Sequence, residues 1–202
     1  MPNTKAEAAF LYLAPGSDPT RDRSILEDDA DRTTFVAVPD QDSAAQVALE
    51  LVDHGVELVE LYGGFGPTAA ARVIEAVGRR VPVGSVGYQG PAAPADPVID
   101  HRAVIYQAGS ADQAVDRLVF QADGQQMTFV AVPFPAAAAP VAVELVDQGI
   151  QLIELCGGLG PVPAADVIEA IGGRVPVGVV QFGAESLAGA SAYAARHASP
   201  TP

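Results

Sequence analysis

The sequence predicts an α/β fold in which one β-α-β-α-β-α-β repeat is written twice, with mainly parallel sheets. Residues 10–88 align without a gap on residues 104–182, and 35 of 55 positions are identical between residues 34–88 and 128–182. So long an ungapped match indicates a tandem duplication. Within each copy, short apolar runs alternate with runs in which apolar residues recur at helical spacing. Runs such as TFVAV and VPVGVV are apolar on both faces, as is typical of parallel strands that are covered on both sides.

Four strands are predicted in each repeat, because aromatic and β-branched residues cluster there in short runs. In the first repeat these strands are residues 8–14, 34–39, 56–61 and 81–88. In the second repeat they are residues 102–108, 128–133, 150–155 and 175–182.

Long helices are predicted between the later strands of each repeat. Residues 43–55 have apolar side chains at helical spacing and end at Gly55, a residue type that often terminates helices. The other predicted long helices are residues 67–78, 140–149 and 163–172. A shorter helix is expected over residues 18–27, with Asp18 as its N-cap and Pro19 at its first position.

The duplication sets the predicted domain boundaries. Residues 1–88 form the first repeat and residues 101–202 the second, and residues 89–100, rich in proline and small residues, form a linker. Two arrangements of the strands stay open. Each repeat forms its own sheet, with the two packed as a pseudo-dimer, or all strands close into a small (βα)8-like barrel. The length of the linker favours separate sheets.

The formal net charge of −14 restricts the partners of the protein. Such a surface repels phosphate backbones and anionic lipid headgroups, so we expect neither nucleic acid nor membrane partners. No apolar run approaches the roughly 20 residues that span a bilayer, and the N-terminus lacks a secretory signal pattern. Cys156 is the single cysteine, which excludes an intramolecular disulfide and agrees with a reducing compartment. We therefore expect a cytoplasmic protein that binds a small molecule, and a homo-oligomer is compatible with the sequence.

The scarcity of lysine and histidine argues against several kinds of cofactor site. Lys5 is the only lysine, so Schiff-base chemistry and a lysine-containing phosphate loop are not expected. His54, His101 and His197 lack ligand-like spacing with one another or with Cys156, so no metal site is predicted. The turns GGFGP and GGLGP lack the spacing of a dinucleotide fingerprint, so neither a nicotinamide nor a flavin is expected. No cofactor is therefore predicted.

The motif ELCGGLGP at Glu154 and its copy ELYGGFGP at Glu60 mark the predicted site. Each follows the third strand of a repeat, and ligands bind at the carboxyl ends of strands in open α/β sheets and in barrels alike. Residues two apart on a strand share a face, so Glu154 projects together with Cys156, and Glu60 with Tyr62.

The glycines of the second motif lead into a predicted helix at Pro161. Exposed backbone N–H groups at such a helix start are a recurrent cradle for anions. The alternative is that the glycines serve only the tight turn, and both interpretations stay open. The candidate ligand-binding glycines are Gly157, Gly158 and Gly160.

Glu154 interrupts an otherwise apolar strand, where an unpaired carboxylate is costly to bury. In one interpretation it accepts hydrogen bonds from the N–H groups of the glycine turn and locks the loop. In the other it acts as a general acid or base. Cys156 is either a small buried side chain or a reactive thiol near a helix N-terminus. Glu154 and Cys156 are the candidate catalytic residues, and Glu60 and Tyr62 are candidate ligand-binding residues.

Three further positions are candidate ligand contacts. Glu185 and Ser186 follow the last strand of the second repeat, where the first repeat has Pro91 and Ala92, although an N-cap role is equally natural. Tyr106 ends the first strand of the second repeat, with a core or rim position as its alternative.

Three segments, FLYLAPGSDP, ELVDHGVELVELYGGFGP and VIEAIGGRVPVGVVQFGAES, resemble a small bacterial family known only as a domain of unknown function. The resemblance covers nearly the whole chain twice, whereas members of that family usually carry one copy. The family usually has cysteine before its glycine turn and Glu–Ser after its last strand. Cys156, Glu185 and Ser186 therefore match the family, and Tyr62 departs from it. The resemblance implies that the second repeat keeps the typical site, and it implies no activity.

Two hypotheses about function follow. In the first, the protein is a cofactor-independent enzyme that performs acid–base chemistry of the isomerase, lyase or cyclase type. Its substrate is a small organic molecule with an anionic or carbonyl group, Glu154 is the base or acid, and Cys156 lines the pocket. In the second, the protein is a non-catalytic ligand-binding or assembly module in which the duplication fuses a symmetric dimer. Both hypotheses stay open.

Overall fold

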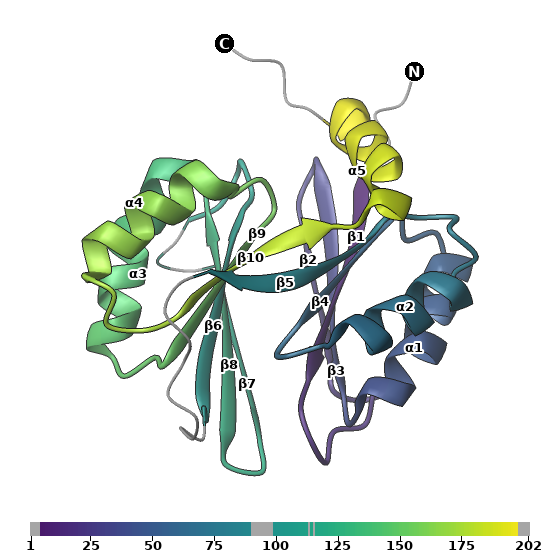
Figure 1. Cartoon of the computed structure of the whole chain (residues 1–202), viewed down its shortest axis with the longest axis horizontal. Helices are drawn as coiled ribbons and strands as arrows, with labels where there is room; N and C mark the ends of the chain where they lie inside the picture. Colours follow the sequence, from purple (N-terminus) through teal and green to yellow (C-terminus); the bar gives the residue numbers. More distant parts are fainter. Residues whose placement is uncertain (1–4, 90–98, 113, 115, 198–202) are drawn as a thin grey trace. The chain divides into compact units, whose positions relative to one another are not determined.

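The computed structural model describes residues 5–89, 99–112, 114 and 116–197. The chain divides into two compact units (Figure 1). Unit 1 is formed by Met1–Ser85 together with Gln181–Pro202, and unit 2 by Val86–Val180. The two units therefore follow different boundaries from those of the sequence repeats.

Unit 1 has a mainly parallel sheet with strand order β2-β3-β1-β4-β5. Strand β1 lies between β3 and β4 and is parallel to both, whereas β2 pairs antiparallel with β3 at the edge. The elements of the first repeat are β1 (Ala6–Leu13), β2 (Arg23–Glu27), β3 (Asp31–Val38), α1 (Gln41–Asp53), β4 (Leu58–Tyr62), α2 (Pro67–Ala76) and β5 (Val83–Gln89).

Unit 2 repeats this topology, with strand order β10-β9-β6-β8-β7. Strand β6 is parallel to β8 and β9, and β7 is the antiparallel edge strand beside β8. The elements of the second repeat are β6 (His101–Gln107), β7 (Arg117–Ala122), β8 (Gln125–Val132), the 3-10 turn η1 (Pro135–Ala137), α3 (Ala138–Asp147), β9 (Leu152–Cys156), α4 (Pro161–Ile171), β10 (Val177–Phe182) and α5 (Ala184–His197).

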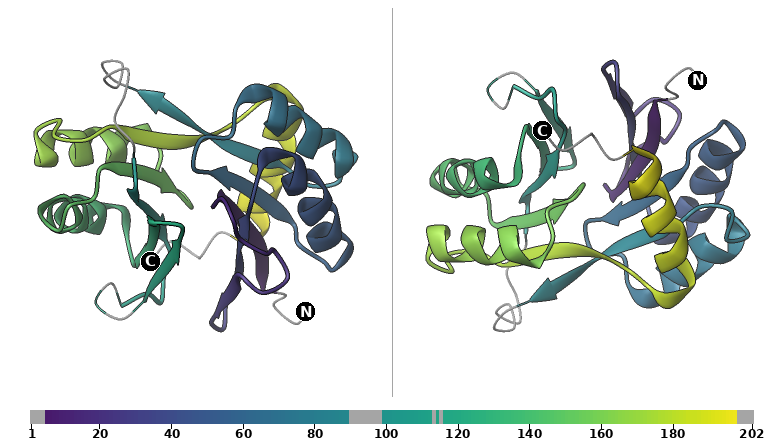
Figure 2. Two further views of the ribbon diagram at one scale, coloured as in Figure 1. Left: turned by 90° about the horizontal axis from the view of Figure 1, so that it is seen from below. Right: turned by 90° about the horizontal axis from the view of Figure 1, so that it is seen from above.

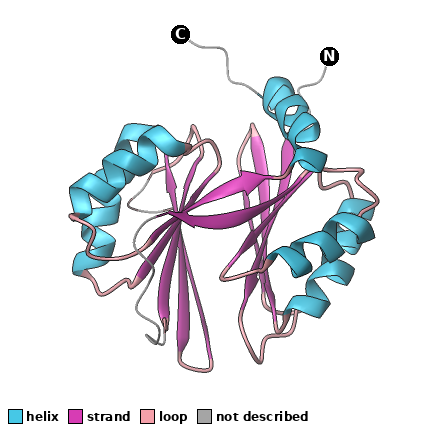
Figure 3. Cartoon of the chain, viewed as in Figure 1, coloured by secondary structure: helices cyan, strands magenta, loops and turns pink. Residues whose placement is uncertain are grey.

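Two helices cover one face of each sheet, α1 with α2 in unit 1 and α3 with α4 in unit 2 (Figures 2 and 3). Alternate side chains of the strands point toward these helices, because successive residues of a strand face opposite sides. On β9, Ile153 and Leu155 belong to the core under α3 and α4, and on β4, Val59 and Leu61 belong to the core under α1 and α2. Each unit therefore has its own hydrophobic core under its helices, and the opposite face of each sheet carries one buried glutamate, Glu60 or Glu154, beside apolar side chains such as Phe10 and Val104.

The predicted fold class is confirmed, because both halves of the chain are α/β units with mainly parallel sheets and the same order of elements. The helix expected over residues 18–27 is wrong. Asp18 accepts hydrogen bonds from the backbone N–H and the hydroxyl of Thr20, which makes a local turn instead of a helix. From Arg23 onward the chain pairs with β3 as β2, so each repeat has the order β-β-β-α-β-α-β.

The two repeats exchange their last segments between the units. Strand β5 begins in unit 1, where Val83 lies beside Val59 of β4, but its residues from Val86 onward belong to unit 2. Strand β10 begins in unit 2, where Val177 lies beside Ile153 of β9, but the chain from Gln181 onward belongs to unit 1. Helix α5 is therefore a part of unit 1 that the second repeat contributes.

The predicted linker, residues 89–100, lies largely outside the described residues, and the repeat boundaries stay a prediction from the sequence. Among the helices in the part of the chain that the structure describes, none is long and apolar enough to cross a membrane.

A matched pair of substitutions tests the assignment of the core. Leu155 is fully buried under α3 and α4, whereas Leu187 on α5 is 58% exposed. We expect Leu155→Ala to lower the free energy of unfolding by about 2–5 kcal/mol, because it removes packed methyl groups and leaves a cavity. Leu187→Ala should change it by less than about 0.5 kcal/mol. Urea denaturation measures both values, and equal losses would contradict this placement of β9.

Candidate functional site

Glu154 lies in the middle of β9, on the face of the unit 2 sheet opposite α3 and α4. Its neighbours Ile153 and Leu155 point into the helix-covered core, so Glu154 points the other way. Its register partners on the adjacent strands are Val104 of β6 and Gly178 of β10. The side chain of Glu154 is fully buried. A buried carboxyl group needs hydrogen-bond partners, and these decide what it can do.

Tyr88 supplies one of these partners. Its hydroxyl donates a hydrogen bond to Oε1 of Glu154 over 2.7 Å. The residue as a whole is 45% exposed, but its hydroxyl end lies against the buried carboxyl group. Burial of that end raises the pKa of Tyr88 above the usual tyrosine range, and the charge of Glu154 and the hydrogen bond act in the same direction. Tyr88 thus links a fully buried acid to the protein surface.

Gly178 makes room for this contact. A Cβ atom at Gly178 would lie 2.4 Å from Cγ1 of Val86 and 2.9 Å from ring carbons of Tyr88. Any side chain at this position would therefore displace the ring whose hydroxyl reaches Glu154. Steric crowding thus explains why the VPVG sequence has glycine at this position in unit 2.

Further side chains share the face of Glu154. Cys156 follows on the same strand and is 2% exposed, and its register partner on β6 is Tyr106, which is 5% exposed. Arg102 lies on the same face of β6 as Tyr106, since the two positions are an even number of residues apart. The positive charge of Arg102 lowers the pKa of Tyr88, against the stronger effect of burial. This face of unit 2 therefore combines an acid, a hydroxyl, a thiol and a guanidinium group.

The glycine turn after β9 has a steric explanation at two of its positions. Gly157 and Gly158 have positive φ angles of 57° and 96°. Cβ atoms there would lie 3.2 Å from the backbone nitrogen of Gln107 and 3.1 Å from its side-chain oxygen, respectively. Gly160 is the N-cap of α4, has open space at its Cβ position and makes no side-chain capping bond. The anion cradle stays a prediction, and Gly160 is the glycine whose surroundings leave room for it.

Unit 1 contains a second buried carboxyl group at the equivalent position. Glu60 on β4 is 3% exposed, and the hydroxyl of Tyr62 donates a hydrogen bond of 2.5 Å to its Oε2. The second repeat has Cys156 at the position of Tyr62, and Phe182 at the position of Tyr88. Each buried glutamate therefore receives a tyrosine hydroxyl, but from a different position.

Helix α5 brings further ionisable groups to unit 1. Nε2 of His197 lies 2.8 Å from Oε2 of Glu57. Burial raises the pKa of Tyr193 above the usual tyrosine range, and the charges of Asp31, Glu60 and Glu57 add to the effect. Tyr193 therefore lies within electrostatic reach of Glu60.

Two predicted ligand contacts of the second repeat also belong to unit 1. Ser186 is 4% exposed, and its hydroxyl oxygen accepts a hydrogen bond from the backbone N–H of Val83 over 3.1 Å. Glu185 lies in the first turn of α5, and its carboxylate folds back over Gly183. Glu154 belongs to unit 2, so the proposed cooperation of Glu185 and Ser186 with Glu154 stays a prediction.

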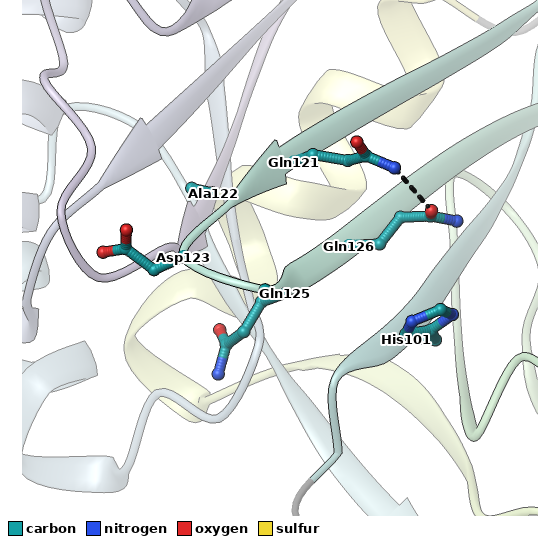
Figure 4. Close-up of a pocket in the computed structure, with 7 residues that line it drawn as sticks. His101, Gln121, Ala122, Asp123, Gln125 and Gln126 are labelled. Atoms are coloured by element: carbon teal, nitrogen blue, oxygen red, sulfur yellow. Dashed lines mark hydrogen bonds between the residues drawn. The ribbon is translucent and has the colours of Figure 1, made fainter.

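A pocket of about 310 Å³ lies at the amino end of β6 in unit 2, beside the hairpin between β7 and β8 (Figure 4). Its wall includes a hydrogen bond of 3.0 Å from Nε2 of Gln121 to Oε1 of Gln126. The glycine turn follows the carboxyl end of β9, at the other edge of this parallel part of the sheet. The pocket is lined by His101, Gln121, Ala122, Asp123, Gly124, Gln125 and Gln126.

Sequence reasoning missed Tyr88, Arg102 and Gln107 as members of the unit 2 site. For Arg102 and Gln107 a signal existed, because the first repeat has Ala8 and Leu13 at these positions. For Tyr88 there was no local signal, since it lies 66 residues from Glu154. Within the described residues, no three His, Cys, Asp or Glu side chains are grouped so that they could hold a metal ion.

Comparison with known proteins identifies the repeat. A family model described as "Family of unknown function (DUF6506)" matches residues 6–95 and again residues 100–195. No curated protein matches the sequence. A crystal structure of an ABC domain in complex with L-Trp from Streptococcus pneumonia matches 86% of this chain and 73% of its own, with 13% sequence identity and a TM-score of 0.26. A likeness this low carries no argument about fold or function.

The buried tyrosines predict that the protein loses stability in alkali. Tyr12 is 1% exposed, and burial together with the charge of Asp22 raises its pKa above the usual value of 10.0. Above about pH 10 the unfolded chain therefore releases tyrosine protons that the folded chain keeps, so stability is present below that pH and falls above it.

We expect the free energy of unfolding to decrease between about pH 10 and pH 11, by up to about 1.4 kcal/mol per pH unit for each such tyrosine. Tyr12→Phe should make the decrease less steep. Denaturation curves at a series of pH values provide the test, and a wild-type stability that stays constant over this range would contradict it.

Proposed function

Because the chain belongs to the family of unknown function DUF6506 and carries its domain twice, we propose a function from the site geometry alone. We propose that unit 2 is a cofactor-independent enzyme site that moves a proton on a small organic molecule with a carbonyl or anionic group. The supporting observation is the hydrogen bond between the exposed Tyr88 and the fully buried Glu154. The reaction would be of the isomerase, lyase or cyclase type.

The arrangement of the two side chains suits proton transfer. Glu154 is fully buried, where a carboxylate lacks the water solvation that makes it a weak base in solution. The contact with Tyr88 also indicates where a ligand would approach Glu154, because Tyr88 is the partly exposed member of the pair. A ligand that displaces the Tyr88 hydroxyl from Glu154 would reach the carboxylate directly.

In the simplest reaction, the Glu154 carboxylate takes a proton from a carbon atom next to a carbonyl group. The Tyr88 hydroxyl has one hydrogen, so it leaves Glu154 and donates to the substrate oxygen, on which negative charge develops. Arg102 places positive charge near the same hydroxyl. Glu154 then returns the proton to a neighbouring carbon, which isomerises the substrate without any oxidant or reductant, or to the same carbon, which only exchanges its hydrogen. Cys156 would line the pocket, and the N–H groups near Gly160 would hold an anionic group.

The two units are unequal candidates for this chemistry. In unit 1 the tyrosine that bonds Glu60 is itself fully buried, since Tyr62 is 0% exposed. Ala8 stands there at the position of Arg102. The unit 1 pair therefore lacks the partly exposed tyrosine that motivates the proposal for unit 2, and it has no cation at the position equivalent to Arg102.

A second candidate function rests on the unit 1 pair. A buried Glu60–Tyr62 pair without an exposed member is what a purely structural pair would look like, and the unit 2 pair could share that role. The protein would then be a non-catalytic ligand-binding or assembly module. Removing the carboxylate of Glu154 would in that case lower stability and leave ligand binding unchanged.

Exchange of carbon-bound hydrogen in deuterium oxide separates the two functions. The wild-type protein is incubated with pyruvate, 2-oxobutanoate and acetoacetate, and loss of the proton signals next to the carbonyl group is followed by NMR. We expect exchange faster than in buffer, and roughly 100-fold slower exchange with Glu154→Gln, because the base is lost.

The matched control is Arg174→Gln, which removes an exposed ion pair of 2.6 Å with Asp147 in the same unit and should exchange at the wild-type rate. A folded Glu154→Gln protein that exchanges as fast as wild type would remove Glu154 from the mechanism. Wild-type exchange no faster than buffer with all three compounds would favour the non-catalytic module.

A further inference from the structure

Each compact unit contains hydrogen bonds between the two sequence repeats, in addition to a hydrophobic core formed by one of them. In unit 1, the hydroxyl of Ser186 accepts the backbone N–H of Val83 over 3.1 Å, and this bond is buried. In unit 2, Tyr88 of the first repeat bonds Glu154 of the second over 2.7 Å. Each repeat therefore supplies a hydrogen-bond partner to a group that the other repeat buries, and loss of a partner in a buried bond costs about 1–3 kcal/mol.

Helix α5 also packs closely against the rest of unit 1. A Cβ atom at Gly189 would lie 3.3 Å from Cδ of Pro82, so the helix backbone lies close to the turn before β5. Farther along the helix, the side chain of His197 is 13% exposed and meets Glu57 at 2.8 Å. Arg196 lies 3.7 Å from the same carboxylate. Both ends of α5 are thus attached to residues of the first repeat.

Glu57, which contacts the C-terminal end of α5, is replaced by an uncharged residue in the second repeat. The second repeat has Gln151 at the position of Glu57. Oε1 of Gln151 accepts hydrogen bonds from the backbone N–H groups of Asp100 and His101, at 2.8 and 3.1 Å. Glu57 instead offers a negative charge to two side chains that are cationic or can become so. The carboxylate therefore suits a partner helix with basic residues in its last turn, as α5 has.

We propose that the surface formed by Glu57, Pro82 and the backbone N–H of Val83 is a protein docking site for the C-terminal segment of a repeat of this kind, covalently linked or not. The partner that fits this surface is the second repeat of the same chain, whose helix α5 lies on it. The two repeats consequently remain bound to each other as separate polypeptides, and the folded protein does not need the covalent connection between them to stay together.

Cleavage of the full-length protein tests this directly. A protease recognition sequence is inserted within residues 90–98 of the otherwise intact chain, and the folded protein is cut there. We expect the two fragments to elute together at the size of the uncut protein at micromolar concentration, and to unfold in one transition. Separation or aggregation of the fragments after cleavage would overturn the proposal.

Two variants of the cleavable protein test the docking surface itself. Glu57→Gln combined with Ser186→Ala removes the charge and the buried acceptor, and should raise the dissociation constant of the cut fragments at least about ten-fold. Asp147→Asn is the matched control, because the ion pair that it breaks with Arg174 lies within one repeat and one unit. Equal dissociation constants for the double variant and the wild type would show that this surface does not hold the partner. The measurement needs no substrate, so its outcome is independent of the proposed enzymatic function.

Discussion

A buried carboxyl group on a central strand is the constraint around which each unit is built. Burying Glu154 or Glu60 without hydrogen bonds would cost several kcal/mol, a large fraction of the stability of a typical domain. Each unit meets this demand with a tyrosine hydroxyl, but the two solutions use different positions. In unit 1 the tyrosine follows two residues later on the same strand, as Tyr62. In unit 2 that position is Cys156, and the hydroxyl arrives from the end of β5, as Tyr88. Tyr88 thus compensates in unit 2 for the absence of a tyrosine at position 156.

The hydrogen bond from Tyr88 to Glu154 depends on the exchange of chain ends between the units. Tyr88 can reach Glu154 because the end of β5 belongs to unit 2, and because Gly178 leaves space for its ring. The same exchange delivers α5 to unit 1, where His197 meets Glu57. The proposed function and the proposed association of the repeats therefore rest on the same feature of the chain. In the proposed function, Tyr88 is the point of entry for the ligand, because it is partly exposed and bonded to a buried acid.

Much of the fold could be predicted because its signals are local or repeated. The TFVAVP strands, the long helices and the glycine turns can each be predicted from a short segment of sequence. The same patterns occur in both repeats. The region from Asp18 to Glu27 could not be predicted correctly, because an Asp–Pro pair is common both at the start of a helix and in a turn that ends after a few residues. Pairing with β3 decided between them. The site was half predictable: Glu154 and Cys156 stand out within their strand, whereas the contact with Tyr88 depends on which unit each strand end joins.

The coupling between Tyr88 and Glu154 tests the account most directly. Unfolding free energies of Tyr88→Phe, Glu154→Leu and the double variant form a double-mutant cycle, which isolates the interaction of the two side chains. The account predicts a favourable coupling of about 1–3 kcal/mol, as for a hydrogen bond to a buried carboxyl group. A coupling indistinguishable from zero would mean that Glu154 does not depend on Tyr88, and the proposed proton-transfer site would lose its basis.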